Sequence, residues 1–164
     1  MPDWMPYARS LIGIKEVPGA GNNSTIMAWA KRLGAKVLGI TYAADSVPWC
    51  GLFTAHVMDH CGVVPPKIAV RASEWGTWGR KLLAPRLGCI LTFTRAGGGH
   101  VGFYVGEDAT HLHVLGGNQS DAVSIARIAK SRLSEMRWPF GVPLPAAKNV
   151  YLSASGAPVT TNER

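Results

Sequence analysis

The sequence predicts an α+β fold in which N-terminal helices pack on a C-terminal antiparallel β-sheet. Stretches within the first 62 residues space their apolar side chains three or four positions apart, as amphipathic helices do. Four stretches between residues 88 and 128 are short, rich in β-branched or aromatic residues, and separated by turn residues. Helices followed by strands are typical of α+β proteins, because α/β proteins alternate the two.

Three helices are expected in the first part of the chain. Gly34 ends the second of them, and Asn or Ser caps its start. In the third, Phe53, Val57 and Cys61 recur every four residues, which predicts one buried face. Two prolines follow this helix and stop it. The expected helices cover residues 3–12, 22–34 and 49–62.

The strands are expected to form an antiparallel meander after a short helix or turn at residues 69–79. The expected strands cover residues 88–94, 99–106, 111–117 and 122–128. One domain over residues 1–141 would contain all these elements, which suits the length of 164 residues. Residues 142–164 are rich in proline, alanine and small polar residues, so we expect a partly disordered extension.

The chain carries 17 Lys and Arg against 10 Asp and Glu, a net charge of +7. Such a surface favours polyanionic partners: nucleic acid, anionic lipid headgroups or bacterial cell wall. No signal-peptide pattern and no apolar run of about 20 residues appears. We therefore expect synthesis in the cytosol, no transmembrane segment and a soluble protein.

Cys50 has the position of a reactive thiol, at the start of the expected third helix. The free backbone N–H groups at a helix start stabilise a thiolate. Cys61 lies at the opposite end of that helix and Cys89 in a strand, where this effect is missing. A disulfide is the weakest interpretation of Cys50, since the count of three is odd and no CxxC pair occurs. Without partners, a buried structural cysteine is the more common case.

His100 and Asn118 supply the partners that a cysteine nucleophile needs. A hairpin centred near Asp108 would place His100 opposite residue 116 or 117, with Asn118 just beyond. Asn118 could then orient the imidazole and leave its other nitrogen facing the sulfur of Cys50. This is the Cys-His-Asn arrangement on which papain-like enzymes converge. Each residue alone could be structural, but the combination favours catalysis.

Blocks of the sequence resemble the CHAP-type peptidoglycan hydrolases, which are cysteine, histidine-dependent amidohydrolases/peptidases of the papain-like superfamily. The resemblance is to a compact single-domain group common in phages and prophages of Gram-negative bacteria, and it spans about residues 5–140. The blocks are "IGIKEVPGAGNN" (12–23), "DSVPWCGLF" (45–53), "GGGHVGFYVGED" (97–108), "LGGNQSDAVSI" (115–125) and "RWP" (137–139).

The resemblance implies a papain-like CHAP fold and hydrolysis of an amide bond in peptidoglycan. It implies Cys50 as nucleophile, His100 as general base and Asn118 as third member. No cofactor and no metal are implied, because Asp45 stands alone where some CHAP domains have an acidic calcium loop. The enzyme would work as an amidase at the muramic acid–L-alanine bond or as an endopeptidase within the peptides, in endolysin-like lysis of bacteria.

The same resemblance fits a protein made in the host cytoplasm that reaches the periplasmic wall after release, as phage endolysins often do. Its partner would be peptidoglycan, with transient contact to an anionic membrane surface. We expect no nucleic-acid partner, and we expect the protein to be a monomer. The backbone N–H of Cys50 can donate to the oxyanion. Further oxyanion or substrate-binding candidates are Trp49, Gln119, Asp45, Trp75 and Trp78.

Two other classes of function stay open. His111 and His113 share one face of a strand and could hold zinc in a metal-dependent wall hydrolase. His56 and His60 have helical spacing, but a zinc-protease motif would need Glu where Val57 stands. The third possibility is a non-catalytic basic module that binds cell wall or nucleic acid through its charge and tryptophans.

Overall fold

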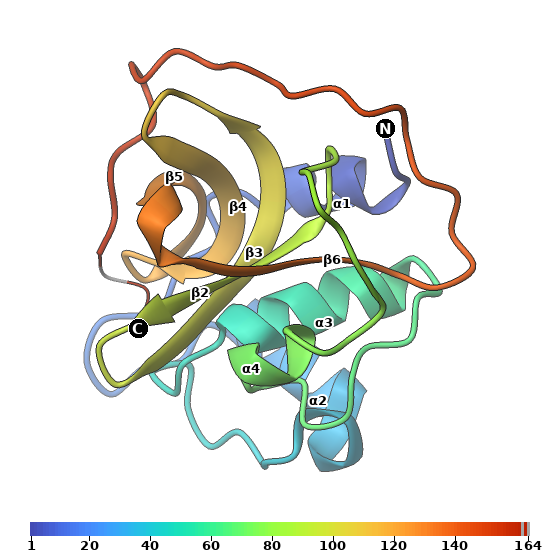
Figure 1. Ribbon diagram of the computed structural model, residues 1–164. Coiled ribbons are helices and arrows are strands. Elements are labelled where there is room, and N and C mark those ends of the chain that lie inside the picture. The colour runs from blue at the N-terminus through green and yellow to red at the C-terminus, as the bar shows by residue number, and fades with distance from the viewer. Residues whose placement is uncertain (162, 164) are drawn as a thin grey trace.

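The computed structural model describes residues 1–161 and 163 and combines helices with one six-stranded antiparallel sheet (Figure 1). This confirms the α+β class. The helices are α1 (Trp4–Ser10), α2 (Ser24–Leu38), α3 (Cys50–His60), α4 (Ala72–Trp75) and the 3₁₀ turn η1 (Lys130–Arg132). The strands are β1 (Arg80–Lys81), β2 (Ile90–Arg95), β3 (Gly98–Glu107), β4 (His111–Gln119), β5 (Ala122–Ala129) and β6 (Leu133–Trp138).

The sheet has the strand order β1-β6-β2-β3-β4-β5. The expected meander is confirmed, because β2 to β5 pair in chain order with antiparallel neighbours. The sequence did not predict β6, which returns to pair with β2 on the outer side of the meander. Its residues, LSEMRW, are half-buried at most positions, so they lack the strong apolar pattern of the inner strands.

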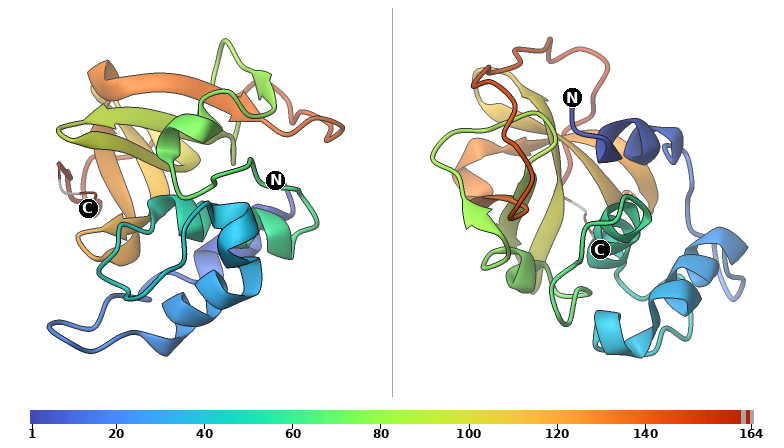
Figure 2. Two further views of the ribbon diagram at one scale, coloured as in Figure 1. Left: turned by 90° about the horizontal axis from the view of Figure 1, so that it is seen from below. Right: turned by 90° about the vertical axis from the view of Figure 1, so that its right-hand side faces the viewer.

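Helix α3 is central rather than one-sided. The sequence predicted a single buried face, but every residue from Cys50 to Met58 is buried. The reason is that α1 and α2 contact α3 on one side, while β3 and β4 contact it on the other. The rings of Phe53 and Phe103 meet edge to face across that second contact, with centroids 6.1 Å apart. Figure 2 shows the three helices gathered on one side of the sheet.

Helix α2 begins as expected, with the Asn23 side chain accepting from the backbone N–H groups of Thr25 and Ile26. Gly34 interrupts the helix with φ 71° and ψ 169°, and a last turn to Leu38 follows the kink. Among the described residues, no helix combines the length and apolar character needed to cross a bilayer.

The extension after residue 141 runs along the outside of the domain and returns to the sheet (Figure 1). Glu107 bonds through its backbone to Val150 and Leu152, at 2.7 and 2.8 Å. The backbone of Arg127 bonds to Pro158 and Thr160, at 2.8 and 3.1 Å. The extension therefore adds short bridges to the sheet. Its expected partial disorder stays a prediction.

Candidate active site

Cys50 is the first residue of α3 and lines a cleft of about 610 Å³. The rim on one side consists of residues from 70–77, which include α4. The opposite wall is the end of the β2–β3 hairpin, with Phe93, Thr94 and Gly99 among its residues. A volume of this size suits a ligand of a few residues.

Two glycines allow the close packing that forms this cleft. A methyl group on Gly51 would collide with the carbonyl oxygens of Ala69 and Val70, so only glycine lets this segment pass the start of α3. A methyl group on Gly117 would meet Phe53 and the Trp49 ring at 2.5 and 2.9 Å. Strand β4 therefore reaches α3 closely enough to bring its end beside Cys50.

The thiol of Cys50 lies against the backbone of β3. Burial raises its pKa above the ordinary value, while hydrogen bonds from the backbone N–H groups of Val101 and Gly51 and the positive charge of Arg95 oppose that rise. The bond from Val101 places the sulfur at the residue that follows His100. At neutral pH the resting group is a thiol, so attack on a substrate requires a base.

His100 is fully buried on β3. The side-chain amide of Gln119 determines its tautomer, that is, which ring nitrogen carries the hydrogen. The amide nitrogen of Gln119 donates to the backbone oxygens of Val114 (3.2 Å) and Ser124 (2.7 Å). Its oxygen therefore faces Nε2 of His100 at 3.1 Å and must accept a hydrogen bond from it. Nε2 then carries the hydrogen, and Nδ1 is left with a free lone pair.

Nδ1 of His100 has no hydrogen-bond partner within the described residues, although it is buried. Burial lowers the pKa of His100 to about 4, while the Glu163 carboxylate and the Gln119 hydrogen bond oppose this shift. The imidazole is therefore neutral near pH 7, with an unprotonated nitrogen available. This is the state that a general base requires.

Asn118, the expected third member, does not bond to His100 in this structure. Its backbone is left-handed, with φ 59°, and neither side-chain polar atom has a hydrogen-bond partner among the described residues. The pairing of Phe103 with Leu115, continued along the two strands, puts Asn118 rather than residue 116 or 117 opposite His100. The β4–β5 pairing shifts between Gly116 and Gln119, and the left-handed Asn118 lies inside this irregularity, so the usual alternation of side chains is broken there. Gln119, expected as an oxyanion or substrate candidate, contacts the imidazole instead.

Trp49 and Asp45 hold the loop that precedes Cys50. The Trp49 indole is buried and donates to Oε1 of Glu16 at 2.7 Å, so its N–H is already used. Asp45 is 1% exposed, and its carboxylate accepts from the backbone N–H groups of Val17 and Asn23, at 2.9 and 2.7 Å. In this structure both side chains tie the 15–23 loop to the start of α3.

Trp75 and Trp78 lie outside the lining of the Cys50 cleft. Trp75 is buried and donates to the carbonyl oxygen of Ala69 at 3.0 Å. Trp78 donates to Val64 at 3.1 Å and borders a different hollow, with Phe140. The segment that contains them does form part of the cleft wall, but through smaller residues such as Ala72, Ser73, Gly76 and Thr77.

The histidines considered for zinc are engaged with a carboxylate. His113 bonds to Asp108 at 2.9 Å, and Nδ1 of His111 lies 3.9 Å from the same side chain. Arg127 also bonds to Asp108 at 2.7 Å, and this guanidinium lowers the pKa of Asp108 well below its usual range. Among residues 1–161 and 163, no group of three or more His, Cys, Asp or Glu side chains has the arrangement of a metal site.

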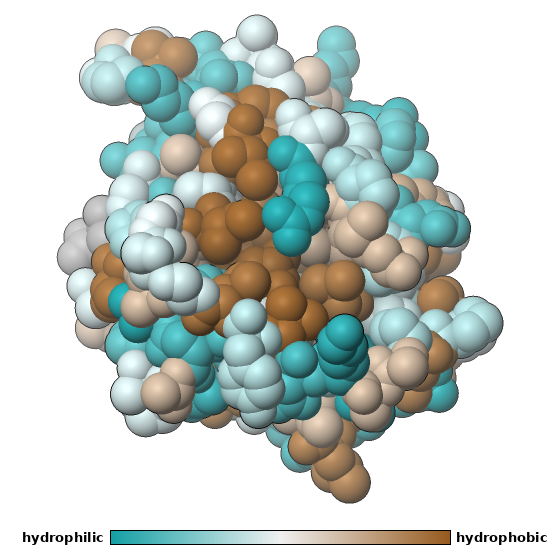
Figure 3. Space-filling model, turned by 90° about the horizontal axis from the view of Figure 1, so that it is seen from above, coloured by the Kyte–Doolittle hydropathy of each residue, from teal (hydrophilic) through white to brown (hydrophobic). Residues whose placement is uncertain are grey.

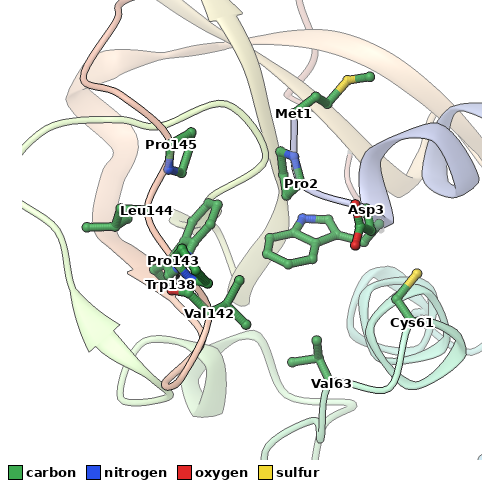
Figure 4. Close-up of a pocket in the computed structure, with 11 residues that line it drawn as sticks. Met1, Pro2, Asp3, Cys61, Val63, Trp138, Val142, Pro143, Leu144 and Pro145 are labelled. Carbon is green, nitrogen blue, oxygen red and sulfur yellow. Dashed lines mark hydrogen bonds between the residues drawn. The ribbon is translucent and has the colours of Figure 1, made fainter.

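A second hollow of about 360 Å³ lies between the N-terminus and the start of the extension (Figure 4). Met1, Trp4, Val63, Trp138 and Leu144 give it an apolar lining. Viewed from above, hydrophobic side chains gather in a depression across this side of the molecule (Figure 3). Cys61 reaches this hollow, but burial and then Asp3 raise its pKa, and its lining includes no histidine among the described residues. It therefore lacks the base found near Cys50.

The structure thus places the Cys50 sulfur at Val101, the residue after His100, and it pairs His100 with Gln119. The charge of Arg95 acts on both Cys50 and His100. Sequence reasoning missed the roles of Glu16 and Arg95. A signal for Glu16 was its place in the "IGIKEVPGAGNN" block, although nothing in that block indicated a bond to Trp49.

A scan of protein-family models finds none that matches the chain, and a search of curated proteins finds no match either. The resemblance to CHAP hydrolases therefore depends on the blocks quoted above.

Proposed function

We propose that the protein is a cysteine-dependent peptidoglycan hydrolase with a papain-like CHAP fold, in which Cys50 attacks an amide bond of the cell-wall peptide. The observation that carries this proposal is the protonation pattern of His100. The Gln119 oxygen accepts a hydrogen bond from Nε2 of His100, which leaves Nδ1 unprotonated. The neighbouring residue, Val101, contacts the sulfur of Cys50. A neutral thiol, a neutral imidazole and an amide orienter are the parts that this chemistry requires.

In the first half of the reaction, Nδ1 of His100 removes the thiol proton as the sulfur bonds to the amide carbonyl carbon. The carbonyl oxygen becomes an oxyanion, to which the backbone N–H of Cys50 at the start of α3 would donate. The imidazolium keeps its Nε2 proton, which remains hydrogen-bonded to the Gln119 oxygen. It then gives its Nδ1 proton to the leaving amine as the carbon–nitrogen bond breaks, and an acyl-enzyme remains.

In the second half, Nδ1 removes a proton from water, and the resulting oxygen bonds to the acyl carbon. The tetrahedral intermediate collapses, the carbon–sulfur bond breaks, and the thiolate recovers the proton from the imidazolium. Catalytic hydrogen bonds are often long in ligand-free enzymes and tighten when substrate binds. The cleft beside Cys50 would admit the peptide, and the substrate would complete the contact between sulfur and imidazole.

The proposal includes synthesis in the host cytoplasm and action on the periplasmic wall after release. Its substrate is either the muramic acid–L-alanine amide or a bond within the peptides. The net charge of +7 supports binding to an anionic wall.

A turbidity assay on permeabilised Gram-negative cells tests the proposal. We expect the wild type to clear the suspension, Cys50→Ala to be inactive, and chelator to have no effect. Loss of activity with chelator, together with an active Cys50→Ala variant, would instead support a zinc hydrolase. Salt-sensitive binding without released fragments would support a binding module. Mass spectrometry of the released muropeptides then identifies the bond.

A further inference from the structure

The cleft beside Cys50 has an excess of positive charge. Its charged lining residues are Arg71, Arg95 and Glu135. Glu135 is already paired, with Lys81 at 3.0 Å and with Arg137 at 3.4 Å. Its negative charge is thus balanced by cations of its own, and the two remaining guanidinium groups favour an anion in the cleft.

Arg71 lies on the rim just before α4 and is exposed. Its side chain makes no hydrogen bond and no ion pair within residues 1–161 and 163. A guanidinium has five N–H donors in a fixed plane and matches the two oxygens of a carboxylate. All of these donors are available to a ligand that enters the cleft.

Arg95 lies at the end of β2, on the side of the cleft formed by the β2–β3 hairpin. Its Nε donates to the carbonyl oxygen of Gly99 at 3.0 Å, and Nη1 donates to Ala96 at 3.4 Å. These bonds fix the guanidinium, whereas Nη2 makes no hydrogen bond within the described part of the chain. Its charge acts on both Cys50 and His100, so it lies near the reacting groups.

We infer that Arg71 and Arg95 form a carboxylate subsite, which selects substrates with a free carboxylate close to the scissile amide. This inference rests on the proposed function and narrows its substrate class to acidic stem peptides. The fixed Arg95 orients the substrate carboxylate beside Cys50. The side chain of Arg71, which has no other partner among the described residues, binds the same carboxylate from the rim of the cleft. A carboxamide at the same place cannot form the charge-assisted bonds, which are about twice as strong as neutral ones.

The test compares two stem-peptide fragments that contain the bond identified by mass spectrometry. They differ only in the carboxyl group nearest that bond, which is free in one and a carboxamide in the other. We expect wild type to cleave the free acid with a kcat/KM about tenfold higher, mainly through KM. Arg71→Gln should lose most of this preference, because the free acid loses its charge-assisted bonds to the rim.

Arg95→Lys provides the second variant. It keeps the positive charge but loses the planar guanidinium, whose N–H groups donate to the carbonyl oxygens of Gly99 and Ala96 in the hairpin. It should retain part of the preference. The matched control is Arg9→Gln, an exposed arginine on α1 away from the cleft, which makes the same change in net charge. It should keep the full preference.

Three results would overturn the inference. Equal cleavage of both fragments by wild type, or an equal loss of preference in Arg9→Gln and Arg71→Gln, would exclude a subsite and leave the proposed hydrolase intact. Failure of wild type to release fragments from whole murein would reject the hydrolase and the subsite together.

Discussion

The side-chain oxygen of Gln119 lies 3.1 Å from Nε2 of His100, and the Gln119 nitrogen is held by two backbone carbonyls. This arrangement determines which imidazole nitrogen carries the proton. Gln119 is therefore a positioning residue: it acts through His100 and selects the tautomer whose Nδ1 can accept the thiol proton.

Replacement of Gln119 by Ala should lower kcat about a hundredfold, because the imidazole loses its preferred tautomer and orientation. KM should change little, since Gln119 does not line the cleft. The variant should also lose about 1–3 kcal/mol of stability, because Val114 and Ser124 lose a hydrogen-bond donor. Steady-state kinetics and chemical denaturation measure the two effects separately.

The comparison variant is Asn118→Gly, which removes the neighbouring amide and suits the left-handed backbone at that position. Its loss of kcat should be at least about ten times smaller than that of Gln119→Ala. Gln119→Glu gives a further readout: a carboxylate on Nε2 should raise the pKa of His100 and move the acid limb of the pH–rate profile upward. The opposite ranking of the two neighbours would return the orienting role to Asn118.

Asn118 and Gln119 show which part of the site could not be predicted from the sequence. The helix N-terminus at Cys50 and the hairpin that contains His100 follow from local patterns, so both could be predicted. The choice between Asn118 and Gln119 depends on strand irregularities that no local pattern specifies. Strand β6 was missed for a related reason, because its pairing with β2 is a long-range contact between half-buried residues.

Asp45 illustrates a second limit. A lone acidic residue near a nucleophile suggests substrate binding, but the structure uses its carboxylate for two backbone N–H groups of a loop about 25 residues earlier. Such a bond depends on where two loops meet in space.

Acid should begin to destabilise the protein at a pH well above the range in which carboxylates are usually protonated. The reason is that two buried histidines are neutral in the folded state. Burial lowers the pKa of His100 and of His56 to about 4. The unfolded chain binds protons near pH 6.5, so stability falls as pH drops from 6.5 to 4 and levels off below. Each histidine contributes about 3 kcal/mol to this loss.

Urea denaturation at several pH values measures this effect. His56→Phe should reduce the loss between pH 6.5 and 4 by about half, although it removes the partner of the Tyr7 hydroxyl and so lowers stability at pH 7. The acid limb of activity should lie near pH 4, where Nδ1 of His100 becomes protonated. A stability that stays constant between pH 6.5 and 4 would contradict buried neutral histidines.

The three cysteines should respond differently to iodoacetamide. Cys89 is fully buried, and burial raises its pKa to about 12, so it should react only after unfolding. Cys61 is partly exposed and should be labelled without loss of activity. Inactivation should instead follow the labelling of Cys50, as peptide mass spectrometry can show. A Cys61→Ser variant should be inactivated at the wild-type rate, and protection of that variant would place the essential thiol at Cys61.

The end of the extension is held by an ion pair between Arg132 and Glu163. Glu163 is fully buried, and its two oxygens accept from Arg132 at 3.0 and 2.8 Å. Glu163→Gln should therefore cost about 2–4 kcal/mol, because one partner of a buried pair is lost. It should also lower the pKa of His100 further, since the Glu163 carboxylate opposes the dominant effect of burial.

Thermal denaturation and limited trypsin digestion at Lys148, an exposed residue of the extension, test this role. Digestion should be slow in wild type and several times faster in Glu163→Gln, because the last bridges to Arg127 open more often. The control is Asp59→Asn, which removes an exposed pair with Arg32 and should cost less than about 1 kcal/mol. Equally rapid cleavage in all three proteins would mean that the ion pair does not hold the extension and that the disorder expected from its composition prevails.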